Sequence, residues 1–140
     1  MKLEITPEQE NKLRELRAQS NQFYDAGQFE ECIRINKQAW SLLPEPKENT
    51  SDSFHISRSL AGYFLKLGKL EEAEEWISVL LNCAKHRIDM GERELLAAEV
   101  AFAKGDLGKA RAHLKTADKN SKGKVWRIAP KEITDFYKSK

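Results

Sequence analysis

Apolar and small residues return at the spacing of helix turns, and one arrangement of them occurs three times along the chain. Residues 23–32, 64–73 and 101–110 align without a gap. In each segment an apolar residue stands four positions before a glycine, and another stands two positions after it. A small residue stands five positions after the glycine. This pattern is typical of two helices joined by a tight turn, so the sequence predicts an all-α fold of three helical hairpins.

The three glycines, Gly27, Gly68 and Gly105, are expected to end the first helix of each pair. A residue without a Cβ atom adopts the left-handed conformation at a helix C-terminus without strain. The small residues lie in the first turn of the second helix, where two helices must approach closely; they are Cys32, Ala73 and Ala110. Asp106 is predicted to cap the second helix of the last pair.

This unit resembles the tetratricopeptide repeat (TPR), a helical hairpin of 34 residues. On that pattern the repeats cover residues 13–46, 54–87 and 91–124. Polar residues replace the expected ones at a few positions, namely Gln19, Ser20 and Asn36 in the first repeat, Ser57 in the second and Glu94 in the third. The resemblance implies a right-handed helix-turn-helix solenoid that forms a single domain over residues 1–140.

Both ends of the repeat region carry helix signals. Thr6, Pro7 and Gln9 combine a capping hydroxyl, a proline at the first helical position and a capping-box glutamine, which predicts a helix that begins at Pro7. Residues 125–140 are expected to cap the last repeat with a short helix, because the end of a solenoid otherwise exposes apolar surface. The side chains expected to cover that surface are Ile133, Phe136 and Tyr137.

In a helix-turn-helix solenoid the first helix of each pair lines the concave face, and residues three and four apart point into it. The predicted partner-binding residues are Arg14, Arg17, Asn21, Tyr24, His55, Arg58, Leu65, Lys66, Glu92, Glu99 and Phe102. Arginines there would bind carboxylates, and aromatic or apolar residues would hold the middle of a partner segment. The same stripe is also compatible with an ordinary solvated helix face.

Composition narrows the possible functions. The chain has 140 residues and a formal charge of +2, which does not favour a general nucleic-acid or membrane binder. Two cysteines are too few for a disulfide framework, so we expect a cytoplasmic protein. Cys83 and His86 have the spacing of two metal ligands, but a stable zinc site needs three or four. We expect neither a metal nor a cofactor and, without a nucleophile and base in a recognisable motif, no enzyme.

We therefore expect a non-catalytic module that binds a protein or peptide partner on the concave face. A small free-standing protein of this kind also resembles the bacterial immunity proteins, which neutralise a cognate toxin by direct binding.

Nucleic-acid binding through the C-terminal region is a third interpretation. Residues 115–140 contain eight lysines and arginines against three acidic residues. Four of these cations surround Trp126, which could stack on a base; they are Lys119, Lys122, Lys124 and Arg127. In the competing interpretation Trp126 and Ile128 pack on the last repeat, and the cations form a solvated surface.

Overall fold

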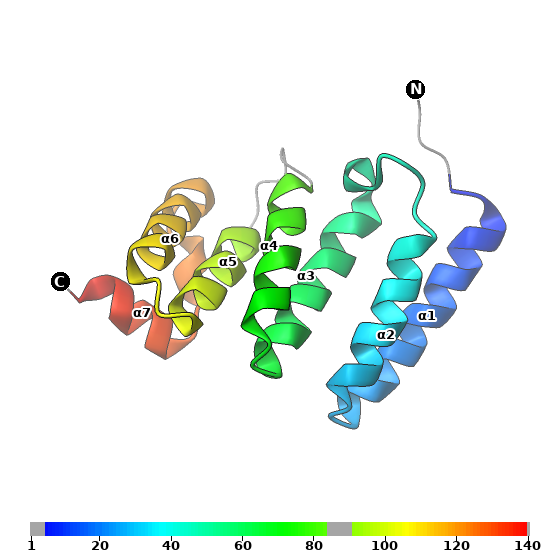
Figure 1. Ribbon diagram of the computed structural model, residues 1–140. Coiled ribbons are helices and arrows are strands. Elements are labelled where there is room, and N and C mark those ends of the chain that lie inside the picture. The colour runs from blue at the N-terminus through cyan, green and yellow to red at the C-terminus, as the bar shows by residue number, and fades with distance from the viewer. Residues whose placement is uncertain (1–4, 84–90, 140) are drawn as a thin grey trace. The chain divides into compact units, whose positions relative to one another are not determined.

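The computed structural model describes residues 5–83 and 91–139, and all regular structure within them is helical (Figure 1). The helices are α1 (Pro7–Asp25), α2 (Phe29–Ser41), the 3-10 helix η1 (Lys47–Asn49), α3 (Ser51–Lys66), α4 (Leu70–Asn82), α5 (Glu92–Ala103), α6 (Leu107–Ser121), the 3-10 helix η2 (Lys124–Arg127) and α7 (Lys131–Lys138). The predicted all-α fold is confirmed. These helices fall into two compact units, α1 to α4 and α5 to α7, and each unit is described by itself.

One type of turn closes the first helix of all three hairpins. Gly27, Gly68 and Gly105 have φ values of 73°, 74° and 83°. Each glycine N–H donates to the carbonyl three residues earlier, at 2.9 to 3.0 Å, and the next N–H donates to the carbonyl five residues earlier, at 2.9 Å. This is a Schellman motif, which satisfies carbonyl groups that a helix end leaves unpaired. The expectation for the three glycines is confirmed.

Close packing within the pairs follows from the small residues after each turn. Cys32, Ala73 and Ala110 are all 0% exposed. In the first unit α1 packs on α2, α2 on α3 and α3 on α4; in the second unit α5 packs on α6. The large buried side chains of the first unit are apolar and include Leu16, Phe54, Leu60, Phe64, Ile77 and Leu80. Ser53 and Ser57 on α3 are also fully buried.

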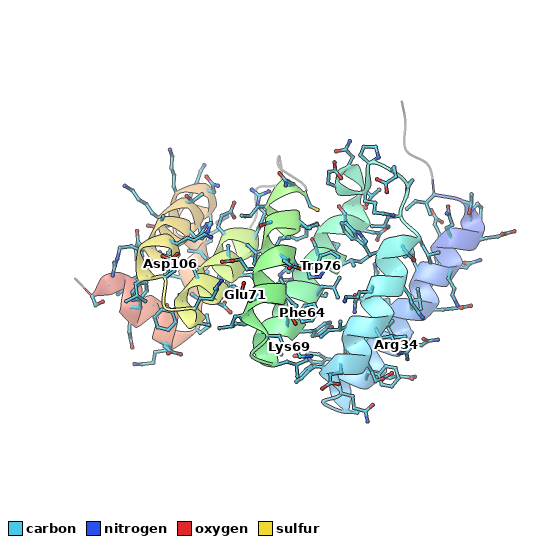
Figure 2. All side chains as sticks on the ribbon, in the orientation of Figure 1. Arg34, Phe64, Lys69, Glu71, Trp76 and Asp106 are labelled. Carbon is cyan, nitrogen blue, oxygen red and sulfur yellow. The ribbon has the colours of Figure 1, made fainter. Side chains whose placement is uncertain are left out.

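Two indole rings join the second helices of the first unit. Trp40 on α2 and Trp76 on α4 meet edge to face, with ring centroids 5.2 Å apart. Trp76 is labelled in Figure 2. Such a contact adds stabilisation beyond the area it buries. The α2 and α4 helices are therefore held together by aromatic contact as well as through α3.

The two helix starts for which the sequence predicts a cap, those of α1 and α6, have local side-chain hydrogen bonds. At α1 the Thr6 hydroxyl accepts from the Gln9 N–H at 3.1 Å, and the Gln9 side chain accepts from the Thr6 N–H at 3.0 Å. At α6 the Asp106 carboxylate accepts from the Lys109 N–H at 3.2 Å. Both predicted caps are confirmed.

The second unit ends in a cap formed by η2 and α7. Ile133 is 4% exposed and joins the core of α5 and α6, and Phe136 and Tyr137 pack against the same core. The capping role predicted for these three residues is confirmed. The expectation that Ile128 packs there is wrong, because it is 41% exposed. Val125, which is 0% exposed, supplies the buried aliphatic side chain instead.

The turn and the helix interior predict opposite effects for the same substitution in the first unit. At Gly68 a Cβ atom meets no other atom within 4 Å, but the positive φ strains an L-residue. We expect Gly68→Ala to lower the free energy of unfolding by about 1–2 kcal/mol. Urea denaturation followed by circular dichroism measures this change.

Gly62 is the matched control because it lies inside α3 and its Cβ position is also open. We expect Gly62→Ala to raise the free energy of unfolding by about 0.5–1 kcal/mol, since alanine restricts the unfolded chain and favours helix. Destabilisation by both substitutions to the same extent would contradict this account of the turn.

Candidate functional site

A pocket of about 330 Å³ lies in the first unit, between α1, α2 and α3. We call it the α1–α3 pocket. Its floor consists of buried aliphatic side chains, Leu13, Leu16, Ile35, Ala39 and Ile56. The rest of its lining is polar and consists of Arg17, Ser20, Asn21, Asn36, Asp52, His55, Ser59 and Tyr63. An apolar floor with a few polar groups around it is the usual composition of a ligand site.

Two contacts between α1 and α3 lie toward the two ends of this pocket. At one end Arg17 Nη2 lies 3.4 Å from Asp52 Oδ1. At the other end the rings of Tyr24 and Tyr63 have centroids 6.2 Å apart. Arg17 precedes Tyr24 on α1, and Asp52 precedes Tyr63 on α3. The two helices therefore run in the same direction, as Figure 1 shows.

The aromatic end is a cluster of three rings. Phe29, at the start of α2, lies 5.8 Å from Tyr24 and 6.1 Å from Tyr63 between ring centroids. Lys66 places its ammonium group 5.7 Å from the centre of the Phe29 ring. Tyr24 remains 47% exposed. The aromatic cluster, Tyr24, Phe29 and Tyr63, therefore presents ring surface next to the pocket.

Ser20, Cys32 and Asn36 form a hydrogen-bonded group where α1 faces α2, which we call the polar base of the pocket. Ser20 and Asn36 depart from the repeat pattern. Asn36 Nδ2 on α2 donates to the Ser20 hydroxyl at 2.9 Å and to the Cys32 carbonyl at 2.8 Å. The Cys32 thiol lies 3.4 Å from the Ser20 carbonyl oxygen. Two of the departures noted in the first repeat, Ser20 and Asn36, thus bond to each other and line the pocket.

Burial changes the acid–base behaviour of two groups at this base. It raises the pKa of the Tyr63 phenol above its ordinary value, although hydrogen bonding with Ser20 and Ser59 acts in the opposite direction. Burial likewise raises the pKa of the Cys32 thiol. The neutral forms of both groups are therefore favoured, and Cys32 has the character of a structural residue rather than a nucleophile.

The structure places three of the predicted partner-binding residues in the pocket, namely Arg17, Asn21 and His55. The other predicted residues of the first unit do not line it. Arg14, Arg58 and Lys66 are exposed, Tyr24 belongs to the aromatic cluster, and Leu65 is partly buried.

Three residues that line the same pocket from α3 were not predicted from the sequence, namely Asp52, Ser59 and Tyr63. Steps of three and then four from His55 lead to Arg58 and Gly62. Two steps of four lead instead to Ser59 and Tyr63, and both series follow one face of a helix with 3.6 residues per turn. Hydrophobic spacing alone did not distinguish these two registers.

The remaining predicted residues belong to the second unit. Glu92 and Glu99 on α5 are partly buried. Phe102 packs against the core, with its ring centroid 5.0 Å from that of Phe136. Glu94, a departure from the repeat pattern, is 7% exposed and accepts from the neighbouring Arg93 guanidinium at 2.8 Å.

Trp126, the centre of the proposed nucleic-acid patch, packs on the last hairpin. Its indole N–H donates to Asp118 Oδ1 at 2.9 Å, and its ring centroid lies 4.8 Å from that of Tyr137. This agrees with the interpretation in which the tryptophan is a packing residue. The cations around it remain exposed; they are Lys119, Lys122, Lys124 and Arg127.

Arg111 on α6 holds the end of α7. Its guanidinium donates to the Tyr137 carbonyl at 2.8 Å and to the Phe136 carbonyl at 3.1 Å. It also lies over the Phe136 ring, 4.6 Å from the centroid. Arg111 thus satisfies two carbonyls at the C-terminus of α7 and also stacks on the ring of Phe136, which packs α7 against the core.

Among residues 5–83 and 91–139 no group of three or more His, Cys, Asp or Glu side chains is placed to bind a metal. The suggested pair Cys83 and His86 falls partly outside these residues, because His86 is not among them.

No helix in the described part of the chain is long and apolar enough to span a membrane. No protein-family model matches the sequence, and a search of curated proteins found no match.

The half-buried phenol of Tyr63 predicts that the stability of the fold depends on pH in the alkaline range. Tyrosine in an unfolded chain ionises near pH 10, and Tyr63 ionises later in the folded protein. The folded state therefore keeps this proton where the unfolded state loses it, and stability falls as pH rises through the unfolded value. We expect Tyr63→Phe to lose less stability than the wild type between about pH 9 and about pH 11. Urea titrations at both pH values measure the difference, and equal losses would contradict the prediction.

The Arg111 contacts predict that a lysine cannot replace this residue. We expect Arg111→Lys to lower the free energy of unfolding by about 1–3 kcal/mol, because two charge-assisted bonds to α7 and the stacking on Phe136 are lost. Arg127→Lys, the same exchange at an exposed position, should change it by less than about 0.5 kcal/mol. Equal effects at the two positions in a denaturation experiment would show that Arg111 does not hold α7.

Proposed function

We propose that this chain is a TPR-like, right-handed helical solenoid that binds a segment of a partner protein in the α1–α3 pocket, without catalysis. The observation that carries the proposal is the pocket itself. It has a buried aliphatic floor and a polar rim, and most of its lining comes from the first helices of two successive hairpins. A concave site of this composition suits a partner side chain better than a solvated helix face does.

The repeated turn geometry supports the assignment to the repeat family. Each of the three hairpins has a glycine at the same place with nearly the same φ, the same pair of backbone hydrogen bonds and a fully buried small residue. These shared features are what a helical repeat requires to stack one hairpin on the next.

The architecture of the site favours binding by a rigid surface. Arg17, Asn21 and Ser59 are carried on helices, and the polar base is tied together by hydrogen bonds between α1 and α2. A preorganised site loses little conformational entropy when a partner binds. Affinity would come from filling the pocket and from polar contacts at its rim.

The test is affinity capture with the purified chain from the cells that produce it. We expect Arg17→Glu and Ser59→Trp to lose a partner that the wild type retains in moderate salt. The first variant reverses the charge at the rim, and the second places an indole ring into the pocket. Loss of partner with an unchanged melting temperature would locate the interaction on this surface.

Arg34→Glu is the matched control, because Arg34, labelled in Figure 2, lies on α2 outside the pocket lining. Arg34 forms its ion pair with Glu31 on the same helix. This variant should retain the partner. If all three variants and the wild type retain the same protein equally, the partner binds elsewhere and the proposal for the pocket is wrong.

A further inference from the structure

The two ends of the α1–α3 pocket differ in chemistry, and this difference specifies the partner. We propose that the bound segment presents an acidic side chain to Arg17, a bulky apolar side chain to the pocket and an aromatic side chain to the aromatic cluster, in that spatial order. The inference rests on the proposed function and adds to it the sequence class of the segment.

The acidic residue of the bound segment is inferred from the contacts and the exposure of Arg17. Its guanidinium has five N–H donors, and the structure shows one contact of 3.4 Å to Asp52. The Arg17 side chain is 64% exposed, so this pair is weak and exchangeable. Exposed Arg14, one turn earlier on α1, adds positive charge on the same side. A partner carboxylate can therefore compete with Asp52 for the N–H donors of Arg17.

The apolar position follows from the size and lining of the pocket. A volume of about 330 Å³ is at the lower limit for a small-molecule site and suits one large side chain with part of its backbone. The five floor residues are aliphatic and buried, so an apolar side chain fits against them. At the rim Asn21 and Ser59 lie where they can bond to the backbone of the segment.

The aromatic position follows from the cluster at the other end. Tyr24 leaves 47% of its surface exposed, and Tyr63 belongs to both the pocket and the cluster. An aromatic side chain of the partner can extend this group of rings by edge or offset stacking. Tyr63 thus joins the pocket to the aromatic cluster.

Helix geometry sets the spacing within the segment. Arg17 and Tyr24 are seven residues apart on α1, which corresponds to about 10 Å along the helix. An extended chain advances about 3.3 Å per residue, so the acidic and aromatic residues of the segment are separated by about three or four positions. The apolar residue lies between them, and the chain direction can be either.

The experiment is selection of random twelve-residue peptides displayed on phage against the immobilised wild-type chain. We expect the enriched peptides to share an acidic and an aromatic residue about three or four positions apart, with a bulky apolar residue between them. Synthetic copies should bind Arg17→Gln about ten- to a hundredfold more weakly than wild type, because a charge-assisted contact is lost. Asp52→Asn should bind them several-fold more tightly, since a competing carboxylate is removed.

Ser59→Trp separates the two proposals. If it abolishes binding of the selected peptides and they carry the expected pattern, both proposals are supported. If it abolishes binding of peptides that are basic or lack the pattern, the pocket is a binding site and the inference about the segment is wrong. If no enriched peptide depends on Ser59 or Arg17, or none is enriched, both are wrong. Arg34→Glu serves as the charge control, and melting curves establish that each variant is folded.

Discussion

Every helical hairpin in this chain depends on a reversal that leaves almost no space between its two helices. The glycine turns direct the second helix back along the first, and the residue five positions later must be small to allow the contact. A side chain larger than alanine or cysteine at Cys32, Ala73 or Ala110 would enter a fully buried position. The rest of the packing, including the pocket, is arranged around this close approach.

The pocket lies where the packing pattern is interrupted. Polar groups at Ser20 and Asn36 occupy positions that the repeat pattern gives to other residues, and their hydrogen bond satisfies both at partly buried sites. Because Ser20 and Asn36 face each other between α1 and α2, the hollow between α1 and α3 has a polar base as well as an aliphatic floor. A departure from the repeat pattern is therefore a part of the candidate site rather than a defect of the fold.

Local features of the fold could be predicted from the sequence, whereas the composition of the site could not. The Thr6 cap, the glycine turns and the small buried residues depend on neighbours within six positions, so their signals are contained in short segments. The pocket brings together residues from 13 to 63, and its lining depends on how α3 is rotated about its axis. That rotation is set by packing on α2 and α4, and for this reason His55 was identified while Ser59 and Tyr63 were not.

The edge-to-face contact of Trp40 and Trp76 gives the first unit an intrinsic optical reporter. Coupled indoles at 5.2 Å produce a near-ultraviolet dichroism that depends on their mutual orientation and vanishes when α2 and α4 separate. The third tryptophan, Trp126, belongs to the second unit and reports through its hydrogen bond to Asp118. The two units thus carry distinguishable chromophores, and the order in which they melt can be followed without any added label.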